Sequence, residues 1–132
     1  MAKVLGIGGV FFKSEGTEGL RRWYRESMGF DVQPWGGVAF SFNRLDREGV
    51  GYTVSGPFDA DTTYFDPSRK PFMLKLRVDD LEGMLAQLRE RGAEVLDRRE
   101  DGDNGKFGYV MDPEGTLLKL WEQIDANPEG HR

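Results

Sequence analysis

The chain has 132 residues, the length of one ordinary domain, so it can bury enough apolar surface to fold without disulfides. It contains no cysteine, which excludes disulfides and thiolate metal sites, and its net charge of -5 disfavours binding to nucleic-acid phosphates. No apolar run approaches the roughly 20 residues that span a bilayer. Because residues 1–5 also lack a signal-peptide pattern, we expect a cytoplasmic protein that binds neither nucleic acid nor a membrane.

The first half of the chain begins with residues 4–13, which are rich in valine, phenylalanine and glycine and predict a strand. A one-sided pattern at helical spacing follows, at Leu20, Trp23, Tyr24, Ser27 and Met28. It predicts an amphipathic helix that ends at Gly29 and places Trp23 and Tyr24 in the core. Three short strands are then predicted, over 30–33, 38–42 and 51–55.

The second half begins with the clearest strand pattern in the chain, an apolar alternation at Phe72, Leu74, Leu76 and Val78. Asp79 and Glu82 have the spacing of a capping box, in which Asp79 is the N-cap of a second helix. The apolar positions of this amphipathic helix are Leu81, Met84, Leu85 and Leu88, and Gly92 ends it. Strands are predicted over 94–98, 107–111 and 117–122, with a turn at 112–115 between the last two.

Both halves therefore have the order βαβββ. Short sequence matches support a duplication, since Glu18-Gly19-Leu20 recurs as Glu82-Gly83-Met84. The sequence predicts an α+β fold in which two tandem βαβββ modules form a curled mixed sheet with a central cup. The expected boundaries are a single domain over 1–125, with module one at 4–56, a polar linker at 57–70 and module two at 71–122, and a disordered tail at 126–132.

Three motifs connect this pattern to a known family. They are Arg22-Trp23-Tyr24 with Met28-Gly29-Phe30, Arg77-Val78-Asp79-Asp80-Leu81, and Asp112-Pro113-Glu114-Gly115 followed by Leu118-Lys119-Leu120-Trp121-Glu122. Together they resemble the vicinal oxygen chelate superfamily, which includes glyoxalase I, bleomycin-resistance proteins and extradiol dioxygenases. The resemblance covers residues 4–122 and implies the same two-module fold.

The resemblance also locates the positions at which metal-dependent members of the superfamily hold a divalent ion. These positions fall near Gly9, near Thr53, on Met73 and on Lys119. None of the four is a normal ligand for such an ion, and Lys119 places a cation where a carboxylate is expected. The only histidine, His131, lies in the expected tail. We therefore expect no metal and no other cofactor.

Strand alternation sorts the side chains of the predicted sheet between its two faces. The residues expected to face the cup are Gly9, Phe11 and Lys13 in the first strand, Met73, Lys75 and Arg77 in the fifth strand, and Leu117, Lys119 and Trp121 in the last strand. The candidate ligand-binding residues are Lys119, Lys75, Thr53, Met73, Trp121, Phe11, Trp35 and Arg77. Alternatively, the cations lie on a solvated rim and the aromatic side chains pack in the core or at a dimer interface.

The leading hypothesis is a metal-independent protein that binds an anionic or aromatic small molecule, resembling the bleomycin-resistance type. The alternative is a glyoxalase-like lyase or isomerase that uses non-metal groups such as Lys119, or Tyr52, whose catalytic residues the sequence does not identify. A third hypothesis is a partner-binding subunit without a ligand. The resemblance suggests a homodimer in each case.

Overall fold

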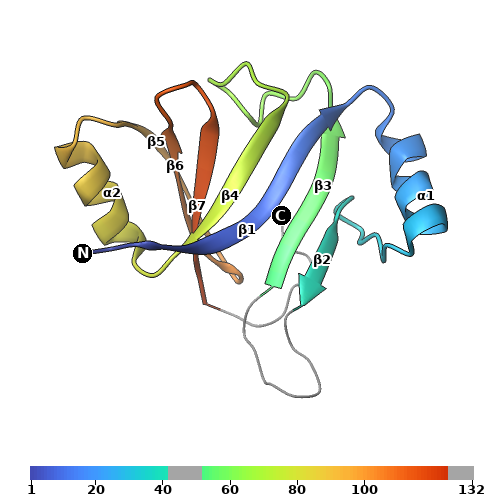
Figure 1. Cartoon of the computed structure of the whole chain (residues 1–132), viewed down its shortest axis with the longest axis horizontal. Helices are drawn as coiled ribbons and strands as arrows, with labels where there is room; N and C mark the ends of the chain where they lie inside the picture. Colours follow the sequence, from blue (N-terminus) through green and yellow to red (C-terminus); the bar gives the residue numbers. More distant parts are fainter. Residues whose placement is uncertain (42–51, 125–132) are drawn as a thin grey trace.

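The computed structural model describes residues 1–41 and 52–124, which form one curled, open, mixed sheet with two helices (Figure 1). In this part of the chain the elements are β1 (Val4–Ser14), α1 (Thr17–Met28), β2 (Val38–Ser41), β3 (Tyr52–Asp59), β4 (Phe72–Val78), α2 (Leu81–Glu90), β5 (Glu94–Gly102), β6 (Gly105–Met111) and β7 (Leu117–Gln123). The strand order is β2-β3-β1-β4-β7-β6-β5. The α+β class and the curled mixed sheet are confirmed.

The duplication is visible in how the strands pair. The first strand of each module is parallel to its last strand, β1 to β3 and β4 to β7, and the two modules join where β1 and β4 pair antiparallel. The strand predicted over 30–33 is wrong. The backbone there closes a turn instead, because the Gln33 amide donates to the Gly37 carbonyl (2.7 Å) and the Gln33 carbonyl accepts from the Gly36 amide (2.8 Å).

Helix α2 packs on the outer face of module two as its spacing predicted. Leu81, Met84 and Leu85 are buried against Val78 and Leu120. The N-cap prediction is wrong by one residue. Asp80 caps the helix by accepting from the Gly83 amide (3.1 Å), while Asp79 accepts from the amide of Lys3 (2.9 Å) and so ties down the N-terminus.

Helix α1 behaves differently from its counterpart. It ends at Gly29, which has a φ of 71°, as predicted. However, no residue of the helix is buried, and Trp23 is 52% exposed, so its predicted place in the core is wrong. Figure 1 shows α1 at the margin of the sheet. Of the predicted apolar side only Leu20 and Tyr24 are partly buried, with Tyr24 stacked on Phe30 (ring centroids 4.8 Å apart), whereas Met28 is 59% exposed.

The segment between the modules contributes to the fold rather than only connecting it. β3 continues to Asp59, into the range expected as linker, and residues 60–71 follow it at the edge of the cup. This segment places Phe65 in the buried cluster of the cup face and Tyr64 at its margin.

Phe42, Gly51 and the expected tail with His131 lie outside the described residues. Neither helix described is long and apolar enough to cross a membrane.

Candidate functional site

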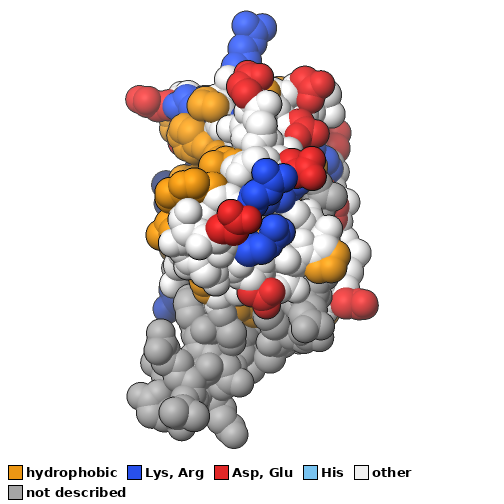
Figure 2. Space-filling view, turned by 90° about the vertical axis from the view of Figure 1, so that its right-hand side faces the viewer, with side chains coloured by type: hydrophobic (Ala, Val, Ile, Leu, Met, Phe, Trp, Pro, Cys, Tyr) orange, Lys and Arg blue, Asp and Glu red, His pale blue; other side chains and the backbone are white. Residues whose placement is uncertain are grey.

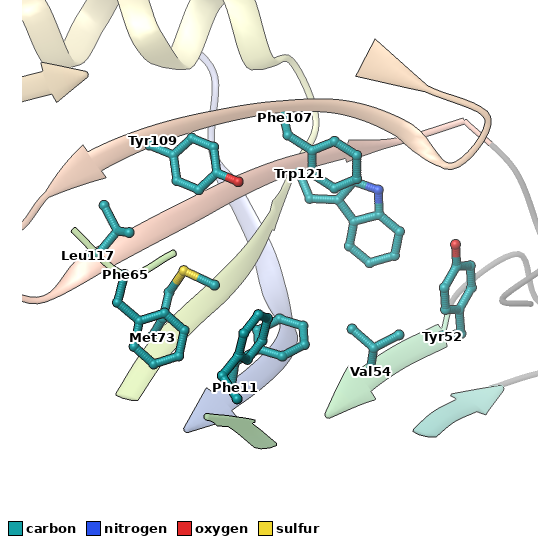
Figure 3. Packing of buried hydrophobic residues seen from close by; sticks show 10 residues of the cluster. Phe11, Tyr52, Val54, Phe65, Met73, Phe107, Tyr109, Leu117 and Trp121 are labelled. Atoms are coloured by element: carbon teal, nitrogen blue, oxygen red, sulfur yellow. The ribbon is translucent and has the colours of Figure 1, made fainter. Parts of the chain in front are cut away.

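The cup, the face of the sheet opposite α2, is filled by large side chains. Figure 3 shows them converging from β6 and β7 on one side and from β1, β3 and β4 on the other. The buried cluster comprises Phe11, Tyr52, Val54, Phe58, Phe65, Met73, Phe107, Tyr109, Leu117 and Trp121. Alternation in β1, β4 and β7 therefore predicted the cup face correctly at Phe11, Met73 and Trp121. The interior of the cup is a packed aromatic core, and any ligand has to bind at its opening.

Two lysines lie inside this apolar cluster. Lys75 and Lys119 pair in register on β4 and β7 and are 0% and 1% exposed. The Lys75 Nζ lies 4.7 Å from the ring centroid of Trp121 and 5.3 Å from that of Phe11. Burial lowers the pKa of Lys75 well below its ordinary value, and the neighbouring charge of Lys119 lowers it further. Glu100 acts in the opposite direction.

Lys119 belongs to a closed ring of polar contacts. Its Nζ donates to the Tyr64 hydroxyl (2.5 Å) and lies 3.4 Å from Oε1 of Glu100. The hydroxyls of Tyr64 and Tyr109 are 2.9 Å apart, and that of Tyr109 donates to Oε2 of Glu100 (2.9 Å). Burial, followed by the proximity of Tyr64, raises the pKa of Tyr109, so this phenol stays protonated.

Arg98 adds a second cation to this ring. Its guanidinium carbon lies 3.7 Å from the ring centroid of Tyr109, and its Nη2 donates to the Tyr64 carbonyl (3.1 Å). Among the residues of the described chain that form this ring, two are cations, Lys119 and Arg98, and one is a carboxylate, Glu100. In an apolar setting, this balance of the described groups favours an anion, although the whole chain is negatively charged.

The ring opens into a pocket of about 410 Å³, lined by Phe58, Thr62, Thr63, Tyr64, Glu100 and Lys119. This volume is within the range typical of small-molecule sites, roughly 300–1,000 Å³. The rings of Phe58 and Tyr64 stack with an interplanar angle of 10°, which gives the pocket a flat apolar wall. The arrangement can bind an anion beside a flat ring, and its hydrogen-bonded groups can also exchange protons.

The predicted site residues lie in three places: in the cup, at its edge, and on the outer face of the sheet. Lys119 lines the pocket, and Lys75, Met73, Trp121 and Phe11 are buried beneath it. Trp35 packs at the edge of the cluster, and Arg77 lies beside Trp121 with 5.8 Å between its guanidinium carbon and the ring centroid. The prediction that Thr53 faces the cup is wrong. Its neighbours Tyr52 and Val54 occupy that face, so alternation turns Thr53 to the outer face.

Sequence reasoning missed Tyr64, Arg98, Glu100 and Tyr109. Tyr64 lies in the segment expected as linker, and Glu100 lies beyond the predicted end of β5. An adjacent Tyr64-Phe65 pair inside an otherwise polar linker was the available signal, because exposed linkers rarely need two large aromatic side chains.

The positions that the family resemblance assigns to a metal ion do not fit one here. A side chain at Gly9 would meet the carbonyl of Val54, Thr53 faces away, Met73 is enclosed by aromatic rings, and Lys119 carries an ammonium group. Residues 1–41 and 52–124 contain no group of three or more acidic, histidine or cysteine side chains placed to hold a metal ion. The donor set at this site suits an anion rather than a divalent cation.

Comparisons with known proteins agree with the fold. The chain is similar to methylmalonyl-CoA epimerase from Streptomyces coelicolor in complex with 2-nitronate-propionyl-CoA (TM-score 0.65, 15% identity, covering 92% of this chain and 99% of the other). It is also similar to methylmalonyl-CoA epimerase from Mycobacterium tuberculosis (TM-score 0.58, 16% identity, covering 92% of this chain and 89% of the other). A third similar structure is a glyoxalase/bleomycin resistance protein/dioxygenase superfamily member from Vibrio splendidus 12B01 (TM-score 0.57, 14% identity, covering 93% of this chain and 100% of the other).

At these identities the structures establish the fold alone. No curated protein matches the sequence. The family profile described as "Glyoxalase-like domain" matches residues 9–121, which is most of the chain. The chain therefore belongs to the glyoxalase-like domain family.

Proposed function

We propose that this protein binds a small organic anion with a flat ring, without a metal ion, at the pocket beside Lys119. The observation that carries the proposal is the Lys119 ammonium, which is buried and yet lines the pocket, at a position where metal-dependent relatives have a carboxylate. Such a protein would resemble the ligand-sequestering bleomycin-resistance type.

Charge and shape both support this assignment. An anion entering the pocket would be attracted by Lys119 and Arg98 more strongly than it is repelled by Glu100, and the low dielectric of the aromatic surroundings would strengthen that difference. The stacked Phe58 and Tyr64 rings would cover a flat apolar body.

A second candidate function is a lyase or isomerase that works by proton transfer, which the closed ring of hydrogen bonds favours. The Glu100 carboxylate would take a proton from a carbon next to a carbonyl, while Lys119 and Tyr64 donate hydrogen bonds to the carbonyl oxygen as it gains charge. After its proton exchanges with solvent, Glu100 would return a proton to the substrate carbon, so no co-reactant is needed. Deuterium incorporation into a carbon acid in D2O distinguishes this function from binding alone.

The binding proposal is tested by calorimetry with 2-naphthoate, with neutral 2-naphthol as the uncharged control and EDTA present throughout. Lys119→Gln should weaken 2-naphthoate binding at least tenfold, whereas Lys106→Gln, on the neighbouring strand and partly exposed, should leave it unchanged. Equal affinity for the two probes, or a requirement for a divalent metal, would contradict the proposal.

The resemblance also supports a homodimer, and the lack of cysteine is consistent with a reducing, cytoplasmic location. Sedimentation equilibrium of the full chain tests the first of these, and fractionation of the source cell tests the second.

A further inference from the structure

A second cavity lies on the other face of the sheet, between α1, the turn around Gly36 and the outer side of β2 and β3. Its volume is about 90 Å³. The apolar walls are formed by Phe12, Tyr24, Phe30, Val32, Val38 and Pro57. Figure 2 shows the molecule from the α1 side, where apolar side chains gather along one border of the face and charged side chains across its middle. This cavity shares no lining residue with the pocket beside Lys119.

The duplication explains why the cavity exists. In module two, α2 lies flush on the sheet, because Leu81 and Leu85 fill the space between them, and both are 0% exposed. In module one, α1 buries no side chain completely, so the corresponding space stays open. Cores are normally packed without voids of this size, because unfilled apolar space costs stability. The space between helix and sheet is filled in module two and open in module one, and this difference suggests that the open space in module one accommodates a ligand.

Arg21 gives this apolar cavity one charged wall. Its Nε donates to the Gly36 carbonyl (2.7 Å) and its Nη2 to that of Pro57 (3.4 Å), which fixes the guanidinium beside the cavity. Gly36 has a φ of 102°, and a Cβ there would lie 2.6 Å from Nη2 of Arg21, so the turn is shaped around the guanidinium. In the described part of the chain Nη1 makes no hydrogen bond, and no acidic side chain forms an ion pair with Arg21.

Acidic groups do lie nearby. Asp59 and Asp61 line an adjoining hollow that Arg21 also lines, and the Asp59 carboxylate accepts from the hydroxyl of Thr17 (2.9 Å). They moderate the positive charge without neutralising it by contact. The guanidinium therefore keeps donors suited to a carboxylate.

We propose that the cavity beneath α1 binds a small monocarboxylate with a short branched or single-ring apolar body. The carboxylate bonds to the free donors of Arg21, and the apolar body lies against Tyr24, Phe30 and Val38. Size limits the class, since a closed cavity of about 150 Å³ holds one benzene molecule. A cavity of 90 Å³ with an open mouth takes an isopropyl-sized group or part of one ring, and excludes a naphthyl group.

The test is a titration of the ¹⁵N-labelled full chain with isovalerate, with isoamyl alcohol as the uncharged control. Saturable shifts are expected at the amides of Val32, Gly36, Gly37 and Gly56, which line the cavity, and not at Tyr64 or Lys119. Arg21→Gln should weaken isovalerate binding at least tenfold. Arg22→Gln, an exposed neighbour on the same helix, should not change it.

Because Arg21→Gln could loosen the turn at Gly36, Val32→Phe provides a second variant, which fills the cavity from the loop and should also abolish binding. Equal affinity for the acid and the alcohol, shifts confined to the Lys119 pocket, or absence of saturation would overturn the proposal. So would a concentration-dependent dimer that covers these amides and excludes isovalerate. Since Lys119→Gln should leave isovalerate binding intact, this proposal and the one for the Lys119 pocket can fail separately.

Discussion

Replacing Lys75 by methionine should stabilise the protein. Lys75 is fully buried, and its Nζ is surrounded by the rings of Trp121, Phe11 and Phe107 at 4.7, 5.3 and 5.6 Å from their centroids. Methionine has a similar length and a flexible apolar chain, so it can occupy the same space among these rings. The substitution removes an ammonium group that loses its hydration on folding and that is close to the charge of Lys119.

Two opposing effects determine the magnitude. Exchanging a buried ionic group for a well-packed apolar one is neutral or stabilising by up to about 4 kcal/mol, while desolvated cation–π contacts are worth about 2 kcal/mol. We expect the free energy of unfolding at pH 7 to rise by about 1 kcal/mol, which raises Tm by about 4 °C in a chain of this length.

The pH dependence of this gain is a sharper check. Because folding lowers the pKa of Lys75, the unfolded state binds more protons between that lowered pKa and the ordinary value of 10.5. The stability of the wild type from this group therefore increases as pH rises across that window, and Lys75→Met lacks the effect. The raised pKa of Tyr109 reduces stability above pH 10 in both proteins and cancels in the difference.

Urea unfolding of both proteins at pH 7, 8, 9 and 10 measures the difference. The advantage of Lys75→Met should be largest at the lowest pH and should shrink toward pH 10. Lys106→Met, at a partly exposed position, should give no such trend. A variant that is less stable than the wild type at pH 7, or a difference that stays constant with pH, would refute the desolvation argument.

Three further outcomes are expected. Gly9→Ala should cost about 1–3 kcal/mol, because its Cβ would lie 2.5 Å from the Val54 carbonyl oxygen, whereas Gly6→Ala, with no described atom within 4 Å, should be neutral in the same urea assay. Asp80→Ala should cost about 1 kcal/mol through loss of the α2 cap, and Asp79→Ala should cost less and affect amide exchange mainly at the N-terminus. Calorimetric affinity for 2-naphthoate should fall as pH rises through the lowered pKa of Lys75, and this trend should be absent in Lys75→Met.

Sequence alone predicts the faces of the central strands, and the reason is physical. In β4 and β7 every second residue is a large aliphatic side chain that α2 must cover, so the intervening Met73, Lys75 and Lys119 are directed to the cup. In β3 the apolar Tyr52 and Val54 alternate with the polar Thr53 and Ser55, so alternation in this strand turns Thr53 away from the cup. The family resemblance placed a ligand position near Thr53. A position carried over from a family in this way can be wrong by one residue, and a shift of one residue in a strand moves the side chain to the opposite face of the sheet.

Other predictions from the sequence fail because a local residue pattern does not determine how far apart two elements lie in the fold. The spacing of Trp23 and Tyr24 predicts an apolar side for α1, but it does not determine how closely the helix approaches the sheet, and Trp23 stays exposed. The polar network around Lys119 joins Tyr64 to Arg98, Glu100 and Tyr109; Tyr64 is 34 residues from Arg98, and no motif links the four. Only the folded arrangement brings them together.

The two modules use one unit in different ways, and this difference locates both proposed sites. In module two, α2 seals the outer face, and the polar groups of β5, β6 and β7 meet the linker at the opening of the cup. In module one, Gly8 and Gly9 leave room for the Trp121 ring and for the backbone of β3, which brings β7 and β3 close to β1. The free space of module one lies on the outer face instead, under α1. Because the two cavities lie on opposite faces and share no lining residue, the fold can hold two ligands without competition between them.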